Sequence, residues 1–388
     1  MNNFEFYSPT RILFGKGSMN KIHEHVPKIG KRVLLVYGKG SIKHNGIYDT
    51  VMRELSDCKV VELSGVEPNP KIESVKQGVK LCRKHQIEVV MAIGGGSSFD
   101  CAKAIAAATF YEGDAWDLVI GHTKVTKALP VVCVVTMSAT GSEMNNVAVI
   151  SNMKTHQKIG LHDDLLCPVL SILDPENLYS VPPMQTAAGT ADILSHLWEQ
   201  FFTNVEDAYV QDGLAIGAMK ACIHYGPIAI HEPTNYSARA NLMWAAPMAL
   251  NGLLKTGYSM TWSCHGMEHV LSAYYDITHG VGLAILTPRW MRYVLDEKTV
   301  SRFKKYGVEV WGLDASKDDY WIANKAIEKT ETFLYETLGL PSCLQEVGID
   351  DTKLEEMAKS CIRDKGGPIQ GFKTLYEEDI LQIFRNCL

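Results

Sequence analysis

One carboxylate and four histidines in the second half of the chain have the types and spacing of metal ligands. Asp192 and His196 lie four residues apart in a segment with helical periodicity, so both side chains project from one helix face. His265 and His269 repeat this spacing, and His279 follows ten residues later. Carboxylate and imidazole together suit Fe²⁺ or Zn²⁺, and the lack of cysteine ligands argues against a closed structural zinc site. The pattern predicts a catalytic metal but leaves open whether His269 or His279 completes the set.

A glycine-rich loop in the first half has the character of a phosphate-binding site. Gly94, Gly95, Gly96 and Ser97 follow a strand-like apolar run and precede an alanine-rich helical segment. Glycines let a phosphate approach the backbone, and the helix N-terminus offers free N–H groups and a favourable dipole. The G-x-G-x-x-G fingerprint is absent. The loop alone therefore predicts bound phosphate, with a structural tight turn as the alternative.

The elements around the glycine loop predict an α/β domain. Apolar, β-branched runs at residues 32–38, 88–97 and 129–142 alternate with helical segments. Runs that are apolar on both faces and separated by helices are typical of a parallel sheet covered on both sides.

Past residue 181 the pattern changes. Strand-like runs almost vanish and long stretches with helical spacing take over. Two consecutive prolines, Pro182 and Pro183, interrupt regular structure and mark a boundary. We therefore expect an α/β domain at residues 1–181 and an all-helical domain at residues 182–388.

The overall composition restricts the classes of protein to which the chain can belong. A chain of 388 residues suits two domains, and 46% hydrophobic with 21% charged residues is typical of a globular protein. The net charge of −6 and the lack of a basic run argue against a nucleic-acid partner. We expect no signal peptide and no apolar run of membrane-spanning length. Ten scattered cysteines favour reduced thiols in the cytoplasm.

The order of these motifs resembles that of the iron-containing (group III) alcohol dehydrogenases, and within them the butanol dehydrogenases and broad-range aldehyde reductases. The resemblance covers essentially the whole chain. It is carried by "FGKG" from Phe14, "YGKGSIKHNGIYD" from Tyr37, "GVEPNP" from Gly65, "GGGSSFDCAK" from Gly94, "SATGSEMNN" from Ser138, "GTADILSH" from Gly189 and "CHGMEHVLSAYYDITHG" from Cys264.

The resemblance implies a Rossmann-like parallel-sheet domain followed by a helical metal domain, the dehydroquinate synthase-like fold. It implies Asp192, His196, His265 and His279 as metal ligands, and His269 as a catalytic residue that relays protons. The cofactor-binding positions implied are Gly38, Gly40, Ser41, Gly95, Gly96, Ser97, Asp100, Thr136, Ser138, Thr140, Lys158 and Tyr179. The implied reaction is hydride transfer between NAD(P)(H) and a primary alcohol or aldehyde, such as butanol or butanal, by a homodimer or larger homo-oligomer.

The choice of nucleotide depends on the segment after the first long strand. Lys39 and Ser41 would accept a 2′-phosphate, so we expect NADP, with NAD possible. Glu62, at the end of the next strand, could instead bond a ribose diol and favours NAD.

Three other functions are compatible with similar sequence motifs. A lyase related to dehydroquinate synthase also uses NAD and a divalent metal, but needs many charged contacts to its substrate. A polyol dehydrogenase differs only in its substrate. A non-catalytic nucleotide-binding protein would need a broken ligand set, whereas all four positions are filled here.

Overall fold

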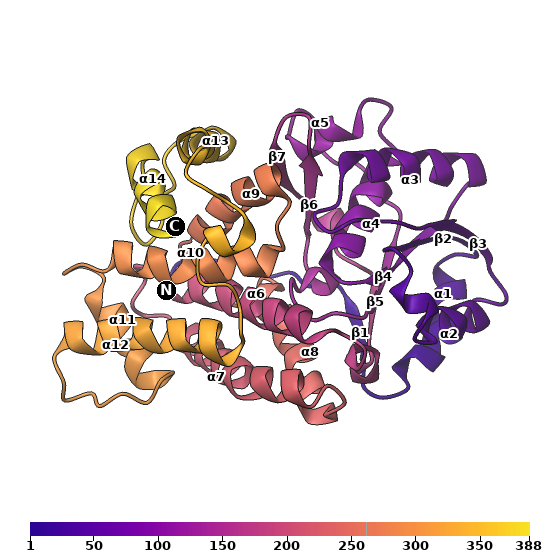
Figure 1. Cartoon of the computed structure of the whole chain (residues 1–388). Helices are drawn as coiled ribbons and strands as arrows, with labels where there is room; N and C mark the ends of the chain where they lie inside the picture. The colour runs from indigo at the N-terminus through magenta and orange to yellow at the C-terminus, as the bar shows by residue number, and fades with distance from the viewer. Residues whose placement is uncertain (261) are drawn as a thin grey trace. The chain divides into compact units, whose positions relative to one another are not determined.

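The structure, a computed structural model, describes residues 1–260 and 262–388. The chain divides into two compact units (Figure 1). The sheet unit contains Tyr7–Val181 and Pro233–Asn251, and the helical unit contains Met1–Phe6, Pro182–Glu232 and Gly252–Leu388.

The sheet unit is built on six parallel strands in the order β1-β8-β5-β4-β2-β3. These strands are β1 (Arg11–Phe14), β2 (Arg32–Tyr37), β3 (Lys59–Leu63), β4 (Val89–Gly94), β5 (Val131–Val135) and β8 (Leu170–Leu173). The central strands are buried along almost their whole length, as expected for a parallel sheet covered on both faces. An antiparallel ribbon of β6 (Val147–Asn152) and β7 (Gln157–His162) adds to the predicted elements.

Helices cover both faces of this sheet (Figure 1). The helices of one face are α3 (Ile72–His85), α4 (Gly96–Ala108) and α5 (Ala115–Val119), and those of the other are α1 (Ile22–Ile29) and α2 (Ile47–Glu54). Side chains of β2 alternate between the two cores, with Leu34 and Val36 in the first and Val33 and Leu35 in the second. This alternation follows from the two-residue period of a strand. The predicted α/β fold is thus confirmed.

The two units divide between Val181 and Pro182, but neither is continuous in sequence. Helix α8 (Tyr236–Leu250) belongs to the sheet unit and Met1–Phe6 to the helical unit, whereas we expected residues 1–181 and 182–388 as two unbroken domains. Met243 of α8 joins the core above the sheet. A Cβ on Gly141 would lie 2.5 Å from the Ala246 carbonyl oxygen, so α8 rests directly on the loop after β5. Sequence periodicity predicted the helix but not the surface it buries.

The helical unit is organised around α6 (Pro183–Phe201), which is buried from its second turn onward. The other helices of this unit are α7 (Tyr209–His231), α9 (Ser263–Tyr275), α10 (His279–Val294), α11 (Val300–Glu309), α12 (Asp319–Thr332), α13 (Leu354–Lys365) and α14 (Glu377–Asn386). Residues 186–201 of α6 are all buried, and α6 packs against α7 and α10. Pro183 occupies the first turn of α6, where its missing N–H costs nothing.

Short helical turns complete the chain. They are η1 (Ser18–Lys21), η2 (Ser41–Lys43), η3 (Ser142–Met144), η4 (Asp164–Leu166), η5 (Pro175–Leu178), the π-helical turn η6 (Phe333–Thr337) and η7 (Gln345–Val347).

Helix α7 also corrects the expectation that no apolar run reaches membrane-spanning length. Its 23 residues include a window with a mean hydropathy of 1.2, which is enough by length and composition to cross a membrane. It is the one such helix in the described part of the chain. A single candidate of this kind is weak evidence, because long core helices of water-soluble proteins meet the same criterion, and α7 packs along α6.

Candidate active site

Helix α6 supplies two of the predicted ligands from its buried face. Asp192 and His196 are 2% and 4% exposed, and their spacing of one helical turn brings Asp192 Oδ1 to 3.6 Å from His196 Nδ1. A carboxylate buried this deeply in an apolar helix needs a compensating cation. Burial, and then the neighbouring His265 and His279, hold the pKa of His196 well below its usual value. His196 is therefore neutral near pH 7, the form that binds a metal.

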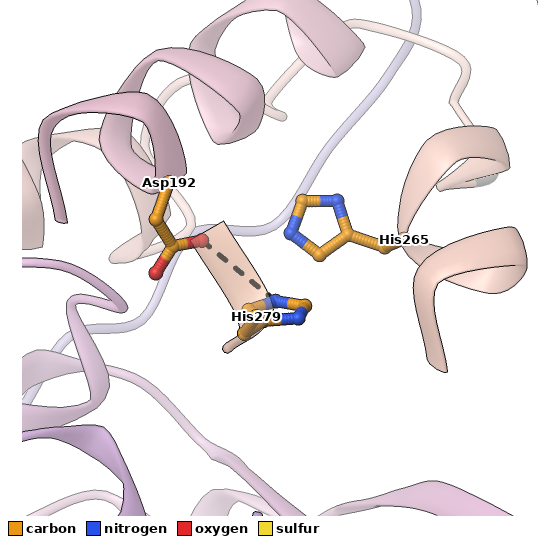
Figure 2. A group of neighbouring side chains, drawn as sticks. All are labelled: Asp192, His265 and His279. Atoms are coloured by element: carbon orange, nitrogen blue, oxygen red, sulfur yellow. Dashed lines mark ion pairs between the residues drawn. The ribbon is translucent and has the colours of Figure 1, made fainter. Parts of the chain in front are cut away.

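Helices α9 and α10 bring two more histidines to Asp192. His265 lies in the first turn of α9, and His279 is the first residue of α10. His279 Nε2 is 3.7 Å from Asp192 Oδ1. Asp192, His265 and His279 each offer a ligand atom within 4.8 Å of the others, and Figure 2 shows the three side chains facing one another. His196 lies beside this close set, with its ring centroid 4.5 Å from that of His265.

These separations fit a divalent cation. Spacings of 3.6 and 3.7 Å are too long for hydrogen bonds. Ligands held about 2.0–2.2 Å from one tetrahedral ion lie about 3.3–3.6 Å apart, close to the spacings observed. His265 Nε2 and His196 Nδ1 are also buried, and neither has a hydrogen-bond partner among the residues that the structure describes. Buried nitrogens of this kind are rare unless a ligand satisfies them, so the donor set fits Fe²⁺ or Zn²⁺.

His269 lies next to this set. Its ring centroid is 6.4 Å from that of His265 and 5.8 Å from that of His279. His269 forms a second group with Glu268 and His279, but His279 Nδ1 is hydrogen-bonded directly to Glu268, which leaves no space for an ion between them. The structure therefore brings His279, and not His269, to Asp192 and His265.

Two buried carboxylates that the sequence analysis missed hold the histidines. Glu199 on α6 contacts Nδ1 of His265, and it also accepts the backbone N–H groups of Cys264 at 2.6 Å and His265 at 3.0 Å. Glu268 on α9 contacts Nδ1 of His279. Because both contacts engage Nδ1, Nε2 of each imidazole remains to bind a metal together with Asp192. The spacing carried a signal, because Glu199 lies three residues after His196 on the same helix face.

Trp262 provides an apolar wall beside these imidazoles. Its ring stands edge to face with His196 and His265, at centroid distances of 5.8 and 5.0 Å. Trp262 has a left-handed backbone with φ of 56°, which is costly for a bulky residue and is found most often at functional sites.

A glycine sets the distance between α6 and α10. A Cβ on Gly280 would lie 2.0 Å from the carbonyl oxygen of Ala188, so only glycine fits this contact between the two backbones. Gly280 follows His279, and Ala188 lies one helical turn before Asp192. The close approach therefore fixes the separation of the carboxylate from the imidazole.

The predicted nucleotide-binding residues lie mostly at one edge of the sheet. The carboxyl ends of parallel strands share an edge, so the segments after β2, β4, β5 and β8 converge there. The chain order reverses between β2 and β4, which is where α/β sheets bind nucleotides. The predicted residues at this edge are Gly38, Gly40, Ser41, Gly95, Gly96, Ser97, Thr136, Ser138, Thr140 and Tyr179.

Two contacts join the loops after β4 and β5. The Thr136 amide donates to the Gly94 carbonyl at 2.8 Å. A Cβ on Gly96 would lie 2.4 Å from Thr140 Oγ1, so the first residue of α4 must be glycine. The Oγ of Ser138 is buried and has no hydrogen-bond partner among the described residues. The N-terminus of α4, where Gly96 is buried and Gly95 and Ser97 are half-buried, and this hydroxyl together fit a phosphate-bearing nucleotide.

Asp100 and Lys158 are buried and take part in a polar network. Asp100 accepts hydrogen bonds from Ser142 Oγ at 2.6 Å and from the Val149 amide at 3.0 Å, and burial raises its pKa. The fully buried Lys103 ammonium donates to Ser142 Oγ at 2.9 Å. Lys158, on β7, is buried as well, and its charge acts to lower the pKa of Asp100. This network fastens the loop after β5 to α4 and the β6–β7 ribbon.

Glu62 lies in a cluster of aromatic and cationic groups at the end of β3. Its carboxylate accepts the hydroxyl groups of Tyr37 and of Tyr48, the latter at 2.9 Å, and Lys43 Nζ is 3.7 Å away. The Lys43 ammonium also stands over both tyrosine rings, 5.3 and 4.6 Å from their centroids. Burial alone would raise the pKa of Glu62, but the tyrosine hydroxyls and Lys43 outweigh it and the net pKa is lowered.

The chain combines a Rossmann-like sheet unit that carries a glycine loop with a helical unit that carries a buried carboxylate–histidine cluster. This combination defines a class of metal- and nucleotide-dependent dehydrogenases. Comparison with known families agrees with this class. Residues 9–175 match the iron-containing alcohol dehydrogenase model, and residues 186–388 match the C-terminal model of the Fe-containing alcohol dehydrogenase family. The chain therefore belongs to the iron-containing alcohol dehydrogenase family, and it is an NAD(P)-dependent alcohol dehydrogenase or aldehyde reductase.

Individual relatives match over nearly the whole chain. NADH-dependent butanol dehydrogenase A of Clostridium acetobutylicum is 53% identical over 99% of both chains. NADPH-dependent aldehyde reductase YqhD of Escherichia coli is 40% identical over 92% of both. The crystal structure of NADH-dependent butanol dehydrogenase A from Thermotoga maritima superposes with a TM-score of 0.95 at 38% identity, covering 100% of this chain and 99% of that one.

Proposed function

We propose that this protein interconverts a short-chain primary alcohol, such as butanol, and its aldehyde, with NADH as the preferred hydride donor. The observation that carries the proposal is the convergence of Asp192 with His265 and His279, with His196 beside them. Nε2 of His265 and Nδ1 of His196 are buried there without a hydrogen-bond partner in the described part of the chain. The names of the C. acetobutylicum and T. maritima relatives support butanol or butanal as the substrate pair.

The four side chains Asp192, His196, His265 and His279 would hold the metal. When bound, a divalent ion supplies Lewis-acid polarisation of the substrate oxygen, worth on the order of several kcal/mol. The family favours iron, and the same donors accept zinc. Asp192 contributes the one anionic charge among these ligands, and the three neutral imidazoles leave a net positive centre.

We assign to His269 the transfer of the proton that accompanies hydride transfer. His269 is half-buried and adjoins His279, whereas His265 and His196 are buried. An imidazole can both accept and donate a proton, so His269 would take the hydroxyl proton in alcohol oxidation and return it in aldehyde reduction. We assign it this relay role on its position alone.

The glycine loop would orient the nucleotide. The backbone N–H groups at the start of α4 and the hydroxyl of Ser138 are available for the pyrophosphate and ribose. Asp100 and Lys158 would support these loops from beneath rather than touch the nucleotide.

The preference for NADH replaces the sequence-based expectation of NADPH. Lys39 and Ser41 favoured a 2′-phosphate, but Glu62 places a fixed negative charge near this segment and holds the Lys43 ammonium against itself. A carboxylate in this region repels a phosphate and can accept a ribose hydroxyl. Relatives of both kinds exist, NADH-dependent at 53% identity and NADPH-dependent at 40%.

The ten free thiols suit a reducing compartment, and we propose a cytoplasmic location on that ground. The expected homodimer or larger assembly stays a prediction, which light scattering of the purified protein would test.

The test is a turnover assay on anaerobically purified protein, with butanal and either NADH or NADPH, before and after addition of Fe²⁺ or Zn²⁺. We expect metal-dependent oxidation of NADH and a lower kcat/KM with NADPH. His265→Ala is expected to lose both metal and turnover. The exposed His224 of α7, replaced by alanine, is the matched control and should change neither. Full turnover by His265→Ala without metal would refute the proposed site.

A further inference from the structure

Each of two predicted ligands has its second ring nitrogen bonded to a buried carboxylate. Glu199 holds His265 and Glu268 holds His279. The two carboxylates differ in their other contacts. Glu199 also caps the start of α9 through two backbone N–H groups. Glu268 makes no such cap in the contacts described here: besides Nδ1 of His279, it accepts the hydroxyl of Ser272 within its own helix.

The packing around Glu268 is shaped to hold it against His279. Glu268 is 0% exposed. A Cβ on Gly282 of α10 would lie 2.9 Å from Glu268 Cγ and 3.3 Å from its Oε1, so a larger residue there would displace the carboxylate. Burying a carboxylate completely is costly unless its charge is used or compensated. This cost, together with the space left by Gly282, indicates a specific task for Glu268.

We propose that Glu268 is a positioning residue that sets the metal affinity of the site through His279. By accepting the Nδ1–H, Glu268 selects the imidazole tautomer whose Nε2 lone pair faces Asp192. The negative charge behind the ring also makes that lone pair a stronger donor. Removal of such an outer carboxylate typically lowers metal affinity about 10- to 100-fold. The proposal rests on the proposed metal site and adds a residue that neither spacing nor the family resemblance had indicated.

The experiment measures Zn²⁺ and Fe²⁺ dissociation constants by chelator competition for the full-length protein and two variants. Glu268→Gln keeps the shape and can still accept the Nδ1–H, but it removes the charge. Glu268→Ala removes both. We expect affinity to fall about 10-fold in the first and towards 100-fold in the second. The absorption spectrum of the Co²⁺-loaded protein should shift in both, because His279 changes as a ligand.

A matched control separates this effect from general destabilisation. Asp212 is also 0% exposed in the helical unit, but it bonds Arg302, Lys305 and Tyr258 rather than a histidine. Asp212→Asn should lower the melting temperature of the metal-free protein and leave the metal dissociation constants unchanged. If Glu268→Ala does not fold, Glu268→Gln still carries the test.

The outcomes are distinct. Wild-type affinity and an unchanged Co²⁺ spectrum in Glu268→Gln and Glu268→Ala would overturn the role of Glu268 while leaving the proposed function intact. A wild-type protein that binds none of these metals would overturn the proposed function itself, and this inference with it.

Discussion

Replacement of Gly280 by alanine is the sharpest test of how the helical unit builds its metal site. The added Cβ would lie 2.0 Å from the Ala188 carbonyl oxygen. An ordinary carbon–oxygen contact is about 3.3–3.6 Å, so α10 must move by roughly 1.3 Å or more. Because the obstacle is backbone rather than a flexible side chain, no rotamer change relieves the clash.

The size of that movement decides the outcome for the metal. His279 Nε2 is 3.7 Å from Asp192 Oδ1, and a further shift of about 1.3 Å would take the pair to about 5 Å. One ion with ligand distances of about 2.1 Å cannot bridge more than about 4.2 Å. We therefore expect Gly280→Ala to lose one ligand and at least about 100-fold in metal affinity, beyond the usual loss of an outer-shell partner. Overpacking should also cost about 1–3 kcal/mol of folding stability.

The assay combines metal content by mass spectrometry with thermal unfolding of metal-free and metal-loaded protein. Gly217→Ala on α7 is the control, because a Cβ there meets no atom of the described residues within 4 Å. That variant should be more stable by about 0.5–1 kcal/mol, as expected for glycine to alanine in an open helix position. A Gly280→Ala protein with wild-type metal affinity and stability would refute the argument that this contact sets the ligand spacing.

Three further outcomes follow from other contacts. Gly96→Ala should raise KM for the nucleotide and leave metal affinity unchanged, because its Cβ meets Thr140 Oγ1 at 2.4 Å in the sheet unit; initial rates at varied NADH measure this. Glu62→Gln should raise the ratio of kcat/KM for NADPH over NADH, because the negative charge is lost and Lys43 is released; an unchanged ratio would contradict the NADH assignment. Asp212→Asn should cost about 3–5 kcal/mol, because it breaks a buried ion pair with Arg302. Burial would raise the pKa of Asp212, but its cationic partners outweigh burial and the net pKa is lowered. The stabilisation by this ion pair is therefore present above about pH 4 and is lost as the pH falls through the pKa of Asp212 in the folded protein. Urea unfolding at pH 7 and pH 3 checks this sign.

The parallel sheet could be predicted because its central strands β2, β4 and β5 are apolar on both faces. The ribbon of β6 and β7 could not, because its alternation of apolar and polar residues is short and includes Gly160 and Lys158. Periodicity predicted α8 as an apolar helix. It could not say that α8 packs on the sheet, because a hydrophobic face does not specify its partner.

The ligand candidates could be predicted from residue types and spacing, but the choice between His269 and His279 could not. His265 and His269 share a helix face, which made them an equally good pair. Asp276 adopts a left-handed conformation with φ of 52° just after α9, and a new helix begins at His279. This reversal brings His279 to Asp192. Glu268 escaped notice because a lone acidic residue in a helix usually faces water.

The sheet unit is discontinuous in sequence, and this has a consequence for synthesis. Its last helix, α8, ends at Leu250, after residues 182–232 that belong to the other unit. Domains usually fold as units while the chain emerges from the ribosome. Here the nucleotide-binding half cannot be complete until residue 251 has been made, so a fragment that stops at residue 181 would expose the surface that Met243 covers. A chimera with a relative must likewise exchange residues 233–251 together with the sheet to keep the sheet core intact.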